Sequence, residues 1–191
     1  ELADDRKVSL AEGAYQGPVE CLSTDRIIAR TIAQNIRHKG ISKVYTEVLG
    51  HAFGNELYVR EWYRDPVAFA ALIDAFEDAT VIGYVEMDGD AQEIRLNPAL
   101  DAVVSKGDRI ILVGESFEST EPRLAQLDNP VVPAESARKP HALRELRRIL
   151  VLGWNERVAL LFEEMDHYEH ERFEATSVSV TTARERRREI R

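Results

Sequence analysis

The stretch Ile149-Leu150-Val151-Leu152-Gly153-Trp154-Asn155 decides the fold class that this sequence indicates. An apolar run that ends in a glycine turn and continues into a helical pattern is typical of a buried strand of a parallel sheet. The pattern predicts a helix over residues 156–165 and one further strand over residues 177–181. Together these elements predict the beginning of a doubly wound α/β domain.

A separate α+β module is predicted upstream, over residues 41–116. Its helix, over residues 67–76, follows Asp65-Pro66, a pair that commonly begins a helix. Its strands are predicted by β-rich runs bounded by turn residues, at residues 43–49, 56–61, 80–87, 93–96 and 109–113. The module therefore reads strand, strand, helix and three further strands, and it reads as complete.

An amphipathic helix is predicted before this module, over residues 24–38. Ser23, Thr24 and Asp25 each suit the N-cap position, and Gly40 suits the end of a helix. The isoleucines of the segment recur at helical spacing, at positions 27, 28, 32 and 36. We expect this apolar stripe to meet another subunit or a domain that lies outside the sequence.

The predicted elements divide the chain into four parts. Residues 1–40 are the end of a first domain and contain the amphipathic pairing helix, and residues 41–116 are the α+β lobe. Residues 117–147 carry several prolines with little periodic apolar content and are predicted to be a linker. Residues 148–191 are the beginning of a second, incomplete, Rossmann-like domain. The order indicates the middle part of a longer, regulatory protein.

Composition excludes several classes of protein. The formal net charge of −9 argues against a nucleic-acid partner, because such proteins concentrate Lys and Arg to neutralise phosphates. The single cysteine, Cys21, excludes an internal disulfide and fits a reducing compartment. No stretch of the sequence approaches the roughly 20 apolar residues of a membrane span. No catalytic constellation emerges either, so we expect a protein that is not an enzyme.

The turn formed by Gly153, Trp154 and Asn155 is the first candidate binding site. A phosphate at such a turn could meet backbone N–H groups and the positive end of the helix dipole. The usual fingerprint has further glycines for close backbone approach, whereas this turn has the bulky Trp154 and is followed by the acidic Glu156. A structural turn is therefore the favoured interpretation, and dinucleotide binding is the alternative.

The acidic hairpin around Glu86, Asp88 and Asp90 is the second candidate site. It concentrates carboxylate oxygens at a tight turn, which suits a hard cation such as calcium. The Asp-Gly pair is also the commonest hairpin turn for conformational reasons alone. The conformational interpretation is favoured, and a calcium site at these three residues is the alternative.

The lobe resembles the C-terminal, TrkA-C-type lobe of regulator-of-potassium-conductance (RCK) domains. The resemblance rests on five stretches: Glu56-Leu57-Tyr58-Val59, the helix around residues 69–76, Val81-Ile82-Gly83-Tyr84-Val85, Leu96-Asn97-Pro98, and the Lys106-Gly107-Asp108 turn with the apolar strand that runs to Gly114.

A narrower resemblance is to the Castor/Pollux-type ion channels. It rests on four stretches: Asp25-Arg26-Ile27-Ile28-Ala29-Arg30, Val44-Tyr45-Thr46-Glu47-Val48-Leu49, Leu96-Asn97-Pro98, and the Ile149 to Asn155 run. The Leu-Gly-Trp turn is the most telling, since it replaces the usual glycine fingerprint as it does in that family. The two resemblances together cover about residues 19–181.

This resemblance implies a cytosolic gating-ring segment of a cation channel, linked to potassium or calcium. The segment would lie on the cytoplasmic side of a membrane and would couple the binding of a ligand or ion to pore opening. Its partners would be other copies of the chain, as dimers within a tetrameric ring, together with the pore and the N-terminal RCK lobe of the same protein. No cofactor is implied with certainty, and calcium is the candidate ligand.

Two other functions remain open at the level of sequence. One is a regulatory subunit of a potassium-uptake system that binds adenine nucleotides, and the other is a fragment of a Rossmann oxidoreductase. Tight binding of ATP or NADH would favour the former, and a cofactor retained through purification would favour the latter.

Overall fold

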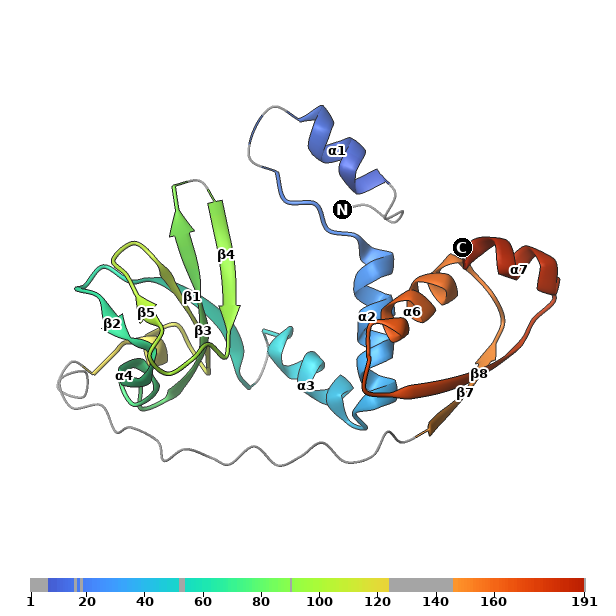
Figure 1. The fold of residues 1–191 in the computed structure, drawn as a ribbon. Helices are drawn as coiled ribbons and strands as arrows, with labels where there is room; N and C mark the ends of the chain where they lie inside the picture. The colour runs from blue at the N-terminus through green and yellow to red at the C-terminus, as the bar shows by residue number, and fades with distance from the viewer. Residues whose placement is uncertain are drawn as a thin grey trace. The chain divides into compact units, whose positions relative to one another are not determined.

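The structure is a computed structural model and describes residues 7–15, 17, 19–51, 54–89, 91–123 and 146–190 (Figure 1). The chain divides into two compact units, which are residues 43–138, and residues 1–42 together with 139–191. One unit is built on an antiparallel sheet and the other on a parallel strand pair. The predicted mixed α/β class is therefore confirmed.

The 43–138 unit is built on a four-stranded antiparallel sheet. Its order across the sheet is β1-β6-β3-β4, with bounds Glu56–Glu61 for β1, Arg109–Gly114 for β6, Ala79–Asp88 for β3 and Ala91–Leu96 for β4. Strands β2 (Val67–Ala68) and β5 (Val103–Val104) form a separate, short antiparallel pair. In the chain, β2 precedes β3 and β5 follows β4. Helix α4 (Phe69–Ile73) follows β2 directly, and the 3-10 turn η2 (Glu118–Thr120) follows β6.

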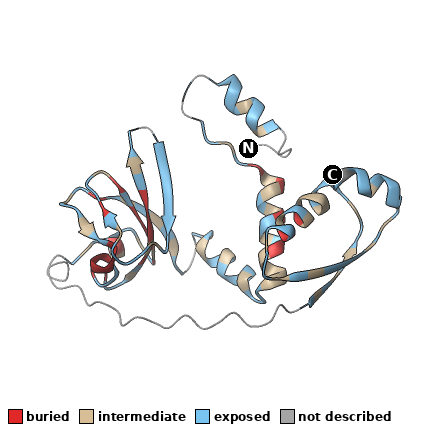
Figure 2. Cartoon of the chain, in the orientation of Figure 1, coloured by how far each residue is buried: buried red, intermediate tan, exposed pale blue. Residues whose placement is uncertain are grey.

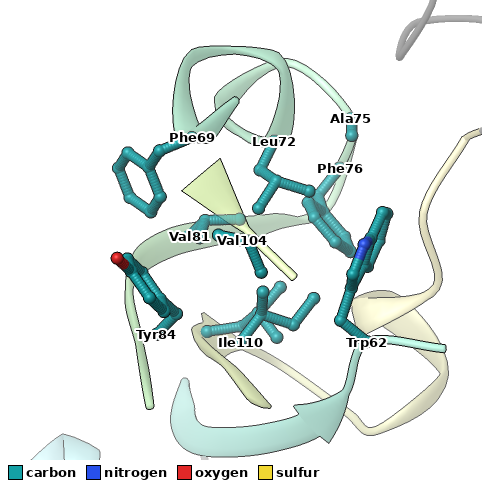
Figure 3. Close-up of a cluster of buried hydrophobic side chains, with 10 residues drawn as sticks. Trp62, Phe69, Leu72, Ala75, Phe76, Val81, Tyr84, Val104 and Ile110 are labelled. Carbon is teal, nitrogen blue, oxygen red and sulfur yellow. The ribbon is translucent and has the colours of Figure 1, made fainter. Parts of the chain in front are cut away.

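One face of this sheet forms the core of the unit. Ile110 and Leu112 alternate along β6 and point inward, as the period of two in a strand requires. Val81 and Tyr84 of β3, on either side of a register shift in that strand, join them against α4 and its flanks (Figure 3). Buried residues gather where α4 meets the sheet (Figure 2). The core cluster comprises Trp62, Phe69, Leu72, Ala75, Phe76, Val81, Tyr84, Val104, Ile110 and Leu112.

A buried carboxylate fixes the turn that leads into β6. Asp108 is 4% exposed and accepts hydrogen bonds from the backbone N–H of Met87 at 3.0 Å and of Ser105 at 2.7 Å. Gly107 has a φ of +97°, a conformation that favours glycine. Asp108 therefore ties the β5–β6 turn to the neighbouring strand β3.

The other unit is built on a strand–helix–strand arrangement. Strands β7 (Leu146–Leu152) and β8 (Arg172–Val178) are parallel and in register from Leu146↔Arg172 to Leu152↔Val178, with α6 (Glu156–Asp166) as the crossover. Helix α2 (Thr24–Arg37) packs on α6, and its core residues Ala29 and Ala33 are fully buried. The remaining helices are α1 (Val8–Ala14), α3 (Ile41–Val48) and α7 (Ala183–Glu189).

The strand predicted over residues 43–49 is wrong, because helix α3 covers Ile41–Val48. Apolar residues lie at positions 41, 44, 45 and 48, which is the helical spacing i, i+3, i+4 and i+7. The β-branched and aromatic side chains of this segment suggested a strand, but their spacing is that of an amphipathic helix.

Two further elements differ from their predicted bounds. The last strand is β8 (Arg172–Val178) and not residues 177–181. All of β8 pairs in register with β7, although the first residues of β8 are largely polar or charged. The helix predicted over 67–76 is only Phe69–Ile73, since Val67 and Ala68 pair with β5 instead. The elements predicted at 24–38, 56–61, 80–87, 93–96, 109–113 and 156–165 are present with small shifts at their ends.

None of the helices in the described part of the chain combines the length and the apolar character that crossing a membrane requires.

Replacing Asp108 by alanine is expected to destabilise the 43–138 unit by about 2 kcal/mol, because two backbone N–H groups lose a charged acceptor. Urea unfolding followed through the fluorescence of the buried Trp62, with Trp154 of the other unit replaced by phenylalanine, measures this loss. Asp101 is exposed, and Asp101→Ala is the matched control with little expected effect. Equal losses in the two variants would contradict the role assigned to Asp108.

Candidate functional site

Helices α2 and α6 lie side by side and run in the same direction. Arg30 Nε donates to Glu164 Oε1 at 2.9 Å, and Arg37 Nε donates to Glu171 Oε1 at 2.7 Å. Each acceptor lies 134 positions after its donor, and a constant offset requires a parallel arrangement. We refer to this paired surface of α2 and α6, including residues 168–171 after α6, as the helix clasp.

The first turns of the two helices are joined by a buried carboxylate. Asp25, whose side chain is 4% exposed, accepts a hydrogen bond from Arg157 Nε at 2.5 Å. The sequence suggested Asp25 as one of three possible N-caps of α2, but Ser23 holds that position and its side chain makes no capping bond. Asp25 instead fixes the start of α2 to the start of α6.

The far end of the helix clasp is a cluster of charges around Glu171. This carboxylate accepts from Arg37 of α2 and, at 3.2 Å, from Arg147 of β7. The Arg37 guanidinium also lies 3.9 Å from the centre of the Tyr168 ring, a cation–π contact. Partial burial alone would raise the pKa of Glu171, but the hydrogen bonds and positive charges of Arg37 and Arg147 hold that pKa below its usual value.

The candidate turn at residues 153–155 joins β7 to α6. Gly153 has a φ of +93°, and its N–H donates to the carbonyl of Val178 at 2.8 Å. Asn155 is the N-cap of α6, and its side chain accepts from the N–H of Arg157 at 3.1 Å. The Trp154 ring lies 6.0 Å from that of Phe162. Asn155 already caps α6, and the acidic Glu156 lies in its first turn. We therefore expect this helix N-terminus to bind a phosphate more weakly than an uncapped one without an acidic residue.

An apolar groove of ≈ 460 Å³ lies beside the helix clasp, between α2, α6 and β7. Its lining includes Ile28, Ile32 and Ile36 of α2 and residues 149–151 of β7. Ile36 of the predicted apolar stripe packs against the core of this unit, whereas Ile27 and Ile32 are 48% and 40% exposed. The predicted contact of this stripe with another subunit stays a prediction.

The acidic hairpin is formed by β3 and β4, but only two of its three predicted ligands can be placed. Glu86 and Asp88 lie on the same face of β3, and Asp90 lies outside the described residues. Glu86 shares the guanidinium of Arg95 with Glu93, at 3.2 and 2.8 Å. Within the described residues no group of three or more His, Cys, Asp or Glu could hold a metal ion. A calcium ion here would have to compete with Arg95.

The structure thus places the two predicted sites on different units and adds residues that sequence reasoning missed. Asp25 pairs with Arg157, and Glu171 joins Arg37 to Arg147. A signal for these pairs is present in the sequence, since arginines at 30 and 37 and glutamates at 164 and 171 are each seven residues apart. Nothing in the sequence connects the two spacings, because they are more than a hundred residues apart.

The sequence matches a family model described as "Castor and Pollux, part of voltage-gated ion channel" over residues 25–129, which is more than half of the chain. The match begins in the first turn of α2 and extends through the antiparallel sheet. The predicted resemblance to Castor/Pollux-type channels is therefore confirmed.

Plant proteins are among the similar curated sequences. A probable ion channel POLLUX of Oryza sativa subsp. japonica is 26% identical over 157 residues, which are 81% of this chain and 15% of that protein. A probable ion channel SYM8 of Pisum sativum is 26% identical over 124 residues, or 64% of this chain and 13% of that protein. The chain therefore spans only about a seventh of the length of these relatives.

Replacing Glu171 by glutamine is expected to destabilise the unit that contains the helix clasp by about 1–3 kcal/mol at pH 7, because Arg37 and Arg147 lose their shared anion. The folded-state pKa of Glu171 is lowered, so its contribution is present above the unfolded-state pKa and is lost as pH falls through the folded value. The wild-type chain should thus lose more stability than E171Q on acidification below about pH 5.

Urea unfolding at pH 7 and at pH 3, with hydrogen exchange of α2 and α6 as the local readout, measures both effects. E174Q is the matched control, since the pair of Glu174 with Arg148 is exposed at 60% and 81% and should matter by less than about 0.5 kcal/mol. The role of Glu171 would be refuted by E171Q behaving like E174Q.

Proposed function

The chain belongs to the Castor and Pollux family of ion channels, and we propose that it is a regulatory segment of such a channel that couples ligand or ion binding to pore opening. The observation that carries the proposal is the family match over residues 25–129, which spans α2, α3 and the antiparallel lobe. The segment lies on the cytoplasmic side of the membrane and carries out no catalysis of its own.

In this proposal the lobe is of the RCK type and the β7–α6–β8 arrangement begins a second, Rossmann-like domain. Its support is the order of the elements, an antiparallel lobe followed by a parallel strand–helix–strand unit with a glycine turn. Strand β7 also carries apolar residues on both faces, as strands of a sheet covered on both sides do. Ile149, Leu150 and Val151 line the groove, and Leu150 and Leu152 are 62% and 76% exposed.

Several copies of the segment assemble into a ring whose expansion acts on the pore. A ligand shifts such a ring only by its differential affinity for the two states of the assembly. Calcium is the proposed ligand, and Glu86, Asp88 and Asp90 are its proposed site. Exposed carboxylates at a tight turn support this choice, and the ion pair of Glu86 with Arg95 is the interaction that calcium would displace.

Calorimetric titration of the chain with calcium, with light scattering to read its mass with and without the ion, tests the proposal. We expect saturable binding with a change in mass or shape, and at least tenfold weaker binding in E86Q/D88N because two carboxylate ligands are removed. E61Q/D101N removes two exposed acids of the same lobe elsewhere and serves as the matched control.

Three results are informative in different ways. Binding that survives in E86Q/D88N contradicts the hairpin site and leaves an ion-sensing segment in place. An oligomer that binds no calcium contradicts calcium as the ligand of this segment. A chain that neither binds calcium nor self-associates contradicts the proposed regulatory assembly as a whole.

A further inference from the structure

Strand β4 is an exposed edge of the four-stranded sheet. It is the last strand in the order β1-β6-β3-β4, and all six of its residues, Ala91–Leu96, are exposed (Figures 1 and 2). Ile94 and Leu96 are 66% and 61% exposed. An edge strand of this length with apolar side chains is a template for pairing with another strand, unless charges, a bulge or a proline block it.

The backbone of β4 has a defined outward-facing set of groups. The N–H of Asn97 donates to the carbonyl of Ile82 at 2.8 Å, so Asn97 bonds inward to β3. Bonding alternates along an antiparallel ladder, and residues 95, 93 and 91 therefore also bond inward. The N–H and C=O groups of Gln92, Ile94 and Leu96 consequently face away from the sheet.

We propose that β4 pairs with β4 of a second copy of this chain, antiparallel and about a two-fold axis at Ile94. In this register Ile94 lies opposite Ile94 of the second copy, and Gln92 lies opposite its Leu96. All three outward-facing residues of each strand then find outward-facing partners, which joins two four-stranded sheets into one. The inference deepens the proposed assembly, on which it rests, by naming a surface through which copies meet.

The charges of β4 select this register over its neighbours. Glu93 lies opposite Arg95 of the second copy, and Arg95 lies opposite its Glu93. Each Arg95, which pairs with Glu86 and Glu93 of its own chain, therefore gains a cross-strand carboxylate as a further partner. The adjacent registers that keep the outward-facing groups paired place Glu93 against Glu93 or Arg95 against Arg95, and both are repulsive. A symmetric interface needs a self-complementary surface, and the order Glu-Ile-Arg provides one.

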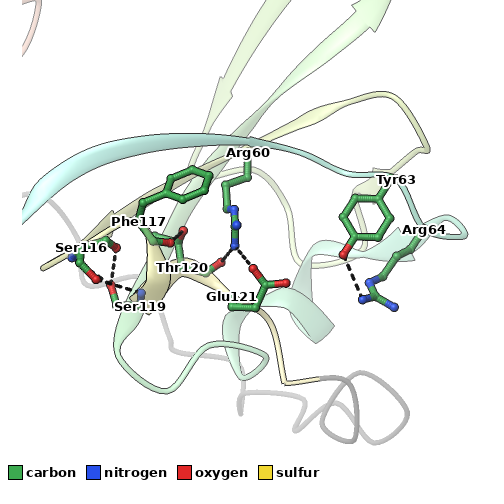
Figure 4. Close-up of polar contacts among 8 residues, drawn as sticks. All are labelled: Arg60, Tyr63, Arg64, Ser116, Phe117, Ser119, Thr120 and Glu121. Atoms are coloured by element: carbon green, nitrogen blue, oxygen red, sulfur yellow. Dashed lines mark hydrogen bonds and ion pairs between the residues drawn. The ribbon is translucent and has the colours of Figure 1, made fainter.

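At the opposite edge, the residues that flank Val59 of β1 are Tyr58 and Arg60, so a two-fold axis at Val59 would place no opposite charges against one another. Arg60 donates to the carbonyl of Thr120 at 2.9 Å and pairs with Glu121 (Figure 4). Its guanidinium also lies 4.2 Å from the centre of the Phe117 ring. Val59, at the middle of β1 and 53% exposed, is therefore the matched control position for Ile94.

Cysteine cross-linking tests the two-fold register directly. Opposed residues of a hydrogen-bonded antiparallel pair have Cα atoms about 5.5 Å apart, which lies within the range that a disulfide spans. In the full chain with Cys21→Ser, we expect Ile94→Cys to form a disulfide-linked dimer under mild oxidation. Val59→Cys should remain mostly monomeric. Equal cross-linking at the two positions, or none at Ile94→Cys, overturns the proposal.

A charge exchange provides the second test. E93R and R95E each place like charges opposite one another, and we expect each alone to self-associate about tenfold more weakly in sedimentation velocity. An equimolar mixture of E93R and R95E restores attraction in both cross-strand pairs, and so does the double variant E93R/R95E. Glu93 and Arg95 are exposed, so these substitutions should leave the fold unaffected. Circular dichroism checks this.

The failures of this proposal and of the proposed function are distinguishable. Single variants that associate as strongly as the wild-type chain overturn pairing through β4, while an assembly through other surfaces stands. Loss of association in both single variants without recovery in the mixture also overturns the register. Failure of the proposed function would be seen instead in the calcium titration, which uses variants that leave β4 unchanged.

Discussion

The contact between α2 and α6 is the interaction on which the unit of residues 1–42 and 139–191 depends. A two-stranded parallel sheet is too small to be stable alone, and β7 and β8 have only α6 as their crossover. Helix α2 supplies the missing layer. Ala29 and Ala33 are fully buried against Leu161 and Met165, and small side chains at these positions allow the two helices to approach closely. The ion pairs at both ends then fix the register of this apolar contact.

How much of the fold the sequence predicts depends on whether the signal is local. The N-cap residues and isoleucine spacing predict α2, and the glycine turn after an apolar run predicts the change from β7 to α6. The sequence does not predict α3 as a helix, because side chains of high β propensity obscure its helical period. It places β8 too late, since the pairing partner of Arg172 is set by β7 and not by local pattern.

The candidate site shows the same division between local and distant information. Gly153 and Asn155 are recognisable from their neighbours, and both take the turn and cap roles that such residues favour. The partner of Asp25 is 132 positions away and that of Arg37 is 134 positions away, so only the fold reveals them. The burial of Asp25 is likewise a property of the packed helices. A carboxylate in the first turn of a helix is ordinarily exposed to solvent, where it interacts favourably with the helix dipole.

The helix clasp joins two segments that flank the 43–138 unit in the chain. Helix α2 precedes the 43–138 unit in the chain and β7 follows it, and both belong to the same compact unit. The lobe is therefore connected to one compact unit at both of its ends. If the helix clasp opened, the two connections would act on separate elements and the lobe could rearrange without moving them together. Under the proposed function, a ligand on the lobe would open the helix clasp only to the extent that it binds the opened state more tightly than the closed one.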